Sequence, residues 1–76
     1  MSEFVICINN NENRASLIIG KVYRKIVDKE AESRSLIRIV DEDRTEPDGY
    51  LYSASMFSTV EIPEEAQRAL MEDEIK

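Results

Sequence analysis

The sequence predicts a mainly β fold, a small closed barrel of five short strands followed by a short C-terminal helix. Two segments carry most of this prediction. Residues 17–23 (LIIGKVY) indicate a turn that leads into a long strand, and residues 49–57 (GYLYSASMF) indicate a strand, a tight turn and a return strand. A chain of 76 residues has a small core, and closing its sheet into a barrel satisfies the hydrogen bonds of the edges. We expect one domain that spans residues 1–76.

The first two strands are predicted on either side of an asparagine-rich loop. Residues 4–8 (FVICI) are too few and too apolar for an exposed helix, so they predict a strand. Residues 9–13 (NNNEN) predict a loop, because asparagine bonds its own backbone and tolerates left-handed dihedral angles. Gly20 supplies the backbone freedom needed where a strand begins, so residues 21–27 predict the second strand. Neither face of that run is purely apolar, which leaves its buried face open.

The middle of the chain predicts a third strand between two charged connections. Residues 28–34 are charged and lack β-branched side chains, which fits either a helical turn or a mobile loop. Residues 35–41 predict a strand with Ile37 and Ile39 on one face. Residues 41–49 predict a hairpin-type connection, because their last three letters (PDG) combine a preset φ, an aspartate cap and a glycine for positive φ.

The last third predicts two short strands and a helix. Residues 50–52 predict a strand with Leu51 on one face and two tyrosines on the other. Residues 53–56 suit one turn of 3₁₀ helix, and residues 57–62 predict the fifth strand. A helix is predicted over about residues 63–73, because it would open with a proline and two glutamates, which favour a helix N-terminus.

The charge balance bears on the kind of partner. The formal net charge is −6, from 16 acidic and 10 basic residues, and such a chain repels a phosphate backbone unless its cations gather on one face. Acidic runs such as residues 41–43 are expected to be solvated charge, and cations gather over residues 21–29. A polarised surface of this kind favours a charged protein partner over nucleic acid.

We expect a cytoplasmic protein that does not enter a membrane. No apolar stretch approaches the ~20 residues of a membrane span, and the acidic start does not resemble a signal peptide. The single cysteine, Cys7, lies in an apolar run and is expected to be a buried, inert thiol. A chain without disulfides suits a reducing compartment.

The order of these elements resembles a Src-homology-3-like barrel, in which a strand runs into a 3₁₀ turn and then a closing strand. The chain is also similar to small bacterial proteins of uncharacterised function over roughly residues 17 to 70. Their pattern is carried by Leu17, Gly20, Lys21, Tyr23, Ile37, Arg38, Asp41, Glu42, Tyr50, Leu51, Tyr52, Ala54, Phe57 and Val60. The resemblance implies the fold and a bacterial origin. The chain departs from signalling Src-homology-3 domains, because it lacks tryptophan and has Ser53 near the place of their proline. This departure puts a polyproline-binding groove in doubt.

Catalysis and metal binding have little support in the sequence. The chain contains no histidine, so the usual general base is missing, and a small barrel has little room for an active-site cavity. Asp41, Asp43, Glu46 and Asp48 do not match a calcium loop, because the glycine required at the sixth position stands at Gly49. We therefore expect no enzyme activity, no cofactor and no metal.

A protein-binding module or accessory subunit is the function that remains. Exposed tyrosines are good interface anchors, so we expect Tyr50 and Tyr52, with Tyr23 and Lys25 nearby, to form the contact surface. The competing interpretation is that one or more of these tyrosines closes the core. The alternative function is nucleic-acid binding by a small barrel, with a basic stacking surface made by Lys21, Arg24, Lys25 and Arg38 beside a tyrosine. The protein would be a monomer or a weak homodimer.

Overall fold

The computed structural model describes residues 3–43 and 45–75, with side chains up to residue 70. The elements are β1 (Glu3–Cys7), β2 (Val22–Ile26), α1 (Lys29–Ser33), β3 (Leu36–Val40), β4 (Tyr50–Ser53), the 3₁₀ turn η1 (Ala54–Met56), β5 (Phe57–Thr59) and α2 (Glu64–Ile75). All five predicted strands are present within a few residues of their expected bounds. The 3₁₀ turn before the last strand and the C-terminal helix are confirmed.

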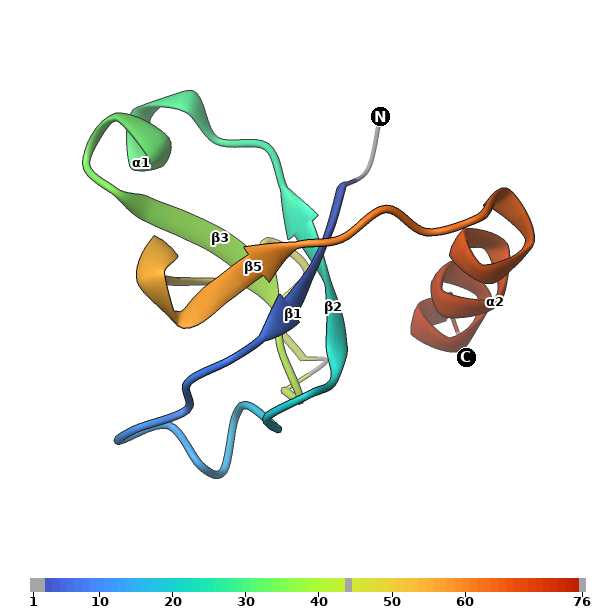
Figure 1. Ribbon diagram of the computed structural model, residues 1–76, viewed down its shortest axis with the longest axis horizontal. Coiled ribbons are helices and arrows are strands. Elements are labelled where there is room, and N and C mark those ends of the chain that lie inside the picture. The colour runs from blue at the N-terminus through green and yellow to red at the C-terminus, as the bar shows by residue number, and fades with distance from the viewer. Residues whose placement is uncertain (1–2, 44, 76) are drawn as a thin grey trace.

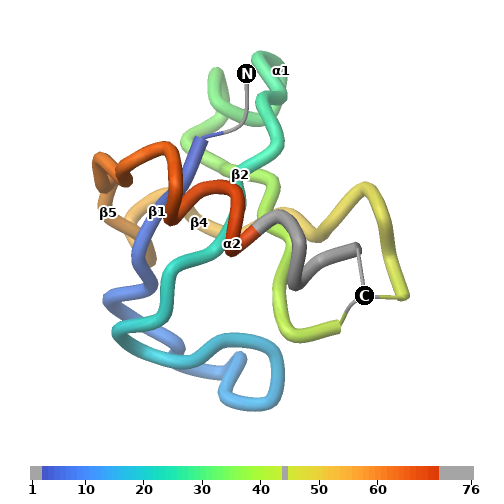
Figure 2. The backbone as a smooth tube through the Cα atoms, turned by 90° about the vertical axis from the view of Figure 1, so that its right-hand side faces the viewer, coloured from blue at the N-terminus to red at the C-terminus, as the bar shows by residue number. Residues whose placement is uncertain are grey.

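The five strands form one antiparallel sheet in the order β4-β3-β2-β1-β5. The sheet curls into a half-barrel, with β1 and β5 in front of β3 in Figure 1. The predicted small-barrel fold is therefore curled but not closed, because the described edge strands β4 and β5 do not pair with each other. The two edge strands, β4 and β5, are joined directly by η1. Figure 1 shows α2 to one side of the curled sheet, and Figure 2, viewed from that side, shows the start of this helix in front of the sheet. No helix among the described residues is long and apolar enough to cross a membrane.

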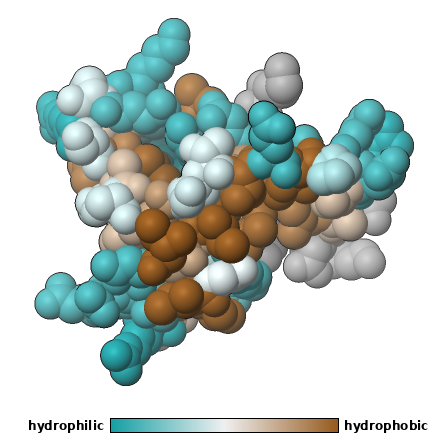
Figure 3. Space-filling model, viewed as in Figure 1, coloured by the Kyte–Doolittle hydropathy of each residue, from teal (hydrophilic) through white to brown (hydrophobic). Residues whose placement is uncertain are grey.

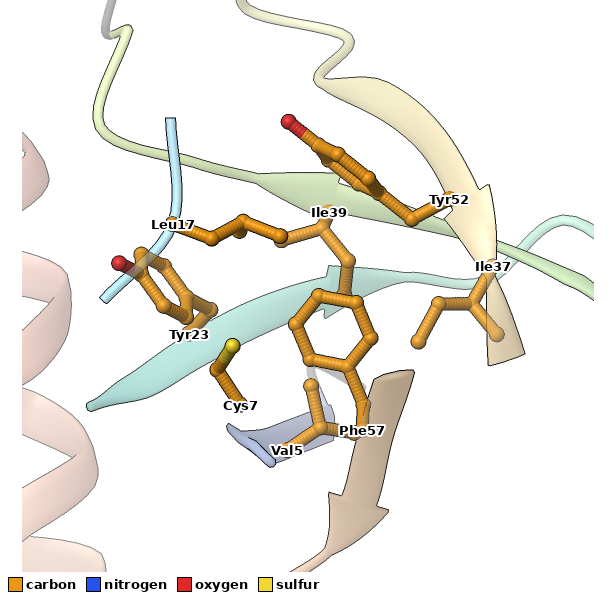
Figure 4. Packing of buried hydrophobic residues seen from close by; sticks show 8 residues of the cluster. All are labelled: Val5, Cys7, Leu17, Tyr23, Ile37, Ile39, Tyr52 and Phe57. Atoms are coloured by element: carbon orange, nitrogen blue, oxygen red, sulfur yellow. The ribbon is translucent and has the colours of Figure 1, made fainter. Parts of the chain in front are cut away.

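The core fills the concave face of the sheet (Figure 4). Strand alternation explains its composition, since Val5 and Cys7 of β1 point inward, as do Ile37 and Ile39 of β3. The predicted burial of Cys7 is confirmed. Ile37 and Ile39 share one face of β3 as predicted, and the structure shows that this face is buried. The remaining members of the cluster are Leu17, Tyr23, Tyr52 and Phe57.

Phe4 and Ile6 of β1 are also apolar, and part of the chain after β5 lies against Phe4. Phe4 is buried, and its carbonyl accepts a hydrogen bond from the Val60 N–H at 3.3 Å. Gln67 of α2 donates from its side chain to the Ile62 carbonyl at 2.8 Å, which attaches the helix to this covering segment. Figure 3 shows apolar side chains gathered in a band over β1 that runs toward α2. Burial of Phe4 on one face and of Val5 and Cys7 on the other therefore explains most of the continuous run FVICI, whose last residue, Ile8, is 54% exposed.

The charged segment after β2 forms the short helix α1. Of the two expected alternatives, a helical turn or a mobile loop, the structure therefore shows the helical turn. Asp28 caps the helix, because its side chain accepts the Ala31 N–H at 3.1 Å. Ala31 is buried against the sheet, and Arg38 of β3 donates to the same Asp28 carboxylate at 3.1 Å. The cap and the packing together stabilise a helix that is too short to form alone.

Both glycines have positive φ, which the turn before β4 predicts for Gly49, whereas the sequence allowed either positive φ or a close approach at Gly20. Gly20 has φ +84° before β2, and Gly49 has φ +67° before β4. They differ in their surroundings: an added Cβ at Gly20 would meet nothing within 4 Å, whereas one at Gly49 would lie 2.8 Å from the Ile39 carbonyl carbon. Gly49 therefore allows both the turn and the close approach of β4 to β3.

Candidate functional site

Each of the three tyrosines donates its hydroxyl to a different carboxylate of one acidic run. The pairs are Tyr52 with Asp41, Tyr23 with Glu42 at 2.7 Å, and Tyr50 with Asp43 at 2.9 Å. We call these six residues the tyrosine–carboxylate cluster. It holds together β2, β4 and the connection that follows β3.

Sheet topology explains how the cluster forms. The acidic run begins directly after Val40, the last residue of β3, and β3 lies between β2 and β4. Tyr23 comes from β2 and Tyr52 from β4, and both side chains belong to the core on the concave face. Figure 4 shows their rings on either side of the Leu17 side chain. The acidic run therefore begins at the end of β3, close to the hydroxyl groups of Tyr23 and Tyr52, which need hydrogen-bond acceptors.

Asp41 is the most deeply buried acid in this cluster, with an exposed fraction of 1%. The expectation that the acidic run is solvated charge is wrong for this residue. Its carboxylate accepts hydrogen bonds from the Tyr52 hydroxyl and from the Asp43 N–H, the latter at 2.9 Å. These two donors make burial tolerable, because a carboxylate without partners would cost several kcal/mol, on the order of its lost hydration.

The two core tyrosines are held in their neutral, hydrogen-donating form. Burial, followed by the hydrogen bond to Asp41, raises the pKa of Tyr52 to about 12. Burial and then the hydrogen bond to Glu42 raise the pKa of Tyr23 well above its ordinary value. Neither hydroxyl is prepared to act as a base or nucleophile near neutral pH.

In the exposed pair, Tyr50 and Asp43, the tyrosine is again the neutral donor and the carboxylate is the charged acceptor. The hydrogen bond to Asp43 raises the pKa of Tyr50. The Thr45 side chain and then its N–H donate to Asp43 and lower the pKa of that carboxyl, with the Tyr50 hydroxyl adding to the effect. Asp43 is therefore a fixed negative charge beside an exposed aromatic ring.

The loop between β1 and β2 is anchored on the cluster. The Ile18 N–H donates to the Tyr23 hydroxyl at 2.8 Å, and the Glu42 N–H donates to the Ser16 carbonyl at 3.0 Å. Lys21 contacts the Glu42 carboxylate at 2.5 Å, and Leu17 has an exposed fraction of 0%. Sequence reasoning missed the structural roles of Leu17 and Asp41. The isolated leucine beside two exposed isoleucines gave no periodic signal for burial.

A hollow of about 370 Å³ lies beside the exposed end of the cluster. Its lining includes Tyr50, Leu51 and Asp43, with Asn13 and Ser16 from the β1–β2 loop opposite. Tyr50 is 39% exposed and Leu51 is 46% exposed, although both belong to a strand. The hollow thus joins an aromatic ring, an aliphatic side chain and a carboxylate on an open surface.

The four residues of the predicted contact surface have different environments. Tyr23 and Tyr52 belong to the core, as the competing interpretation required for at least one tyrosine. Lys25 is half-buried, and its ammonium lies 3.5 Å from Glu3 and within 3.4 Å of another carboxylate, that of Glu32 on α1. Tyr50 is the exposed member of the set. The structure therefore concentrates the candidate surface on Tyr50 and adds Leu51.

Among the described residues, no group of three or more acidic or cysteine side chains could hold a metal ion. The described carboxylates of the cluster face tyrosine hydroxyls, backbone N–H groups and Lys21.

No family model matches the chain, and no curated protein or solved structure is significantly similar to it. The resemblance to small bacterial proteins stays a prediction.

Proposed function

We propose that this protein is a non-enzymatic protein-binding module or accessory subunit with a Src-homology-3-like topology. The topology is supported by the strand order β4-β3-β2-β1-β5 and by the 3₁₀ turn that joins β4 to β5. This arrangement is the one that the sequence resemblance implies. A fold of this kind does not identify a function, so the proposal depends on the surface.

The observation that carries the proposal is the exposed pair Tyr50 and Leu51 on an edge strand. The Tyr50 side chain points toward the hollow described above, and the Leu51 side chain next to it on β4 points to the opposite face of the sheet. The Tyr50 ring is held in place by its hydroxyl bond to Asp43. An exposed tyrosine beside a hollow is a typical anchor of a protein interface.

The nucleic-acid alternative has less support once the ion pairs are known. Lys21 contacts Glu42, Lys25 contacts Glu3 and Glu32, and Arg38 contacts Asp28 at 3.0 Å. Three of the four cations proposed for a basic stacking surface thus lie beside carboxylates. Such pairs weaken the attraction to phosphates on which nucleic-acid binding depends.

Quantitative affinity capture tests the proposal. The tagged wild-type protein, the double variant Tyr50→Ala/Leu51→Ser and the control Ile19→Ser would be compared in lysates of the host. Ile19 is 59% exposed, so its replacement removes a similar amount of apolar surface elsewhere. We expect at least one protein that is retained by the wild type and the control but lost with the double variant. Identical captures by all three proteins would contradict the proposal, provided that circular dichroism shows them folded.

A further inference from the structure

The free edge of β4 determines how a partner can be bound. Within the described part of the chain, β4 pairs with β3 along one side and ends the sheet on its other side. An edge strand offers unpaired N–H and C=O groups to an additional strand. Tyr50 and Leu51 are the exposed large apolar residues of this strand, so a segment paired with β4 would lie directly against them.

Strand alternation decides what each side of such a segment would meet. Tyr50 and Tyr52 are opposite Ile39 and Ile37, so they lie toward the concave face and the hollow. Leu51 is opposite Arg38 and lies toward the convex face. Successive residues of an added strand would therefore alternate between the hollow and the neighbourhood of Leu51.

The charges on the two sides differ. On the convex side, Arg38 pairs with Asp28 and Arg34 pairs with Glu30, so the described charges there balance. On the hollow side, the Asp43 carboxylate accepts the hydrogen bond of the Tyr50 hydroxyl, at the edge of an exposed ring. A carboxylate at the edge of an exposed aromatic ring is suited to an ammonium or guanidinium group, which can contact the carboxylate and lie over the ring.

We infer that the β4 edge binds an extended basic segment of a partner protein by strand addition, with lysine or arginine side chains toward Asp43 and Tyr50 and apolar side chains toward Leu51. This inference rests on the proposed function and specifies its partner. The net charge of −6 adds a long-range attraction for such a segment. A second copy of this chain is a poorer occupant, because two chains that each carry a net charge of −6 repel each other.

Selection from a phage-displayed library of random short peptides tests this inference. Wild-type protein would be the bait, and selected peptides would be made synthetically for titration against isotope-labelled protein by NMR. We expect peptides in which basic and apolar residues alternate. Their binding should shift the amide signals of Tyr50 to Ser53, slow hydrogen exchange on β4, and weaken as salt is raised.

Two protein variants and one modified peptide separate the contributions, and a third variant is the control. Tyr50→Ala should abolish measurable binding, and Asp43→Asn should weaken it several-fold, because it removes the charge and keeps an acceptor for the Tyr50 hydroxyl. Glu65→Gln is the matched control, since it removes one charge from an exposed position on α2 and should change little. A peptide with an N-methylated backbone at its centre should bind far more weakly than its parent, because it cannot complete the strand.

The possible failures are distinguishable. Selected peptides that need Tyr50 but are not basic, or that bind Asp43→Asn as well as wild type, would overturn the inference and leave the proposed function standing. Peptides that tolerate N-methylation would overturn the strand-addition mode. A library that gives no peptide dependent on Tyr50 or Leu51 would overturn both proposals.

Discussion

The hydroxyl of Tyr52 donates a hydrogen bond to the buried carboxylate of Asp41, which lies 11 residues earlier in the chain. This pair connects β4 to the start of the β3–β4 connection inside the core. The same acidic run accepts the hydroxyls of the other two tyrosines, so one short segment fixes three aromatic side chains. The tyrosine–carboxylate cluster therefore holds β2, β4 and the β3–β4 connection together. Its exposed end at Tyr50 is the candidate binding surface.

Removal of the Tyr52 hydroxyl should destabilise the fold. We expect Tyr52→Phe to lower the free energy of unfolding by about 1–3 kcal/mol, because a buried carboxylate loses one of its donors. Urea unfolding followed by circular dichroism measures this change. Tyr50→Phe is the control, since it removes an equivalent bond at an exposed position and should have a much smaller effect. Equal losses in the two variants would contradict the role assigned to burial.

Alkaline pH should unfold the protein through its tyrosines. Burial and Asp41 raise the pKa of Tyr52 to about 12 in the folded state, whereas an unfolded tyrosine titrates near about 10. A raised folded pKa stabilises the protein below pH ~10, and this contribution is lost as the pH rises toward 12. Unfolding experiments between pH ~8 and pH ~12, with tyrosinate absorbance recorded in parallel, check the expectation. The decline should be shallower in Tyr52→Phe. An equally steep decline would show that other groups cause it.

Leu17 should behave as a core residue although it lies in a loop. We expect Leu17→Ala to cost about 2–5 kcal/mol, because the side chain is fully buried between β2 and the cluster. Ile19→Ala is the matched comparison, since that side chain is mostly exposed, and it should change stability little. Thermal and urea unfolding of both variants measure the difference. A small effect of Leu17→Ala would mean that the loop is not part of the cooperative unit.

The two glycines should respond differently to alanine. At Gly20 the added methyl group has space, so Gly20→Ala should cost only the left-handed strain of about 1–2 kcal/mol. At Gly49 the same strain is joined by a clash with the backbone of Ile39, and we expect a larger loss or failure to fold. Expression level, circular dichroism and melting temperature of the two variants test this order. A Gly49→Ala variant as stable as Gly20→Ala would contradict the close approach of β4 to β3.

Local sequence patterns were enough to predict most of the fold. The five strands were predicted from short apolar runs and from the turn residues Pro47 to Gly49, and the 3₁₀ turn from residues 53–56, which are poor strand formers. These predictions were possible because strand alternation and turn chemistry are local properties. The residues of the candidate site were harder to assign. Tyr50 and Tyr52 stand on the same side of one strand and look equivalent in the sequence, yet one is mostly buried and the other exposed.

The sequence by itself determined the element order, the positive φ of Gly49 and the burial of Cys7. Only the tertiary structure decided that α1 is a helix, that Asp41 and Leu17 are buried, and that the tyrosines share three consecutive acids. The physical reason is that these features depend on contacts across the curled sheet: β2 and β4 bring Tyr23 and Tyr52 to the end of β3, where the acidic run begins. No local pattern records where two strands distant in the chain place their side chains.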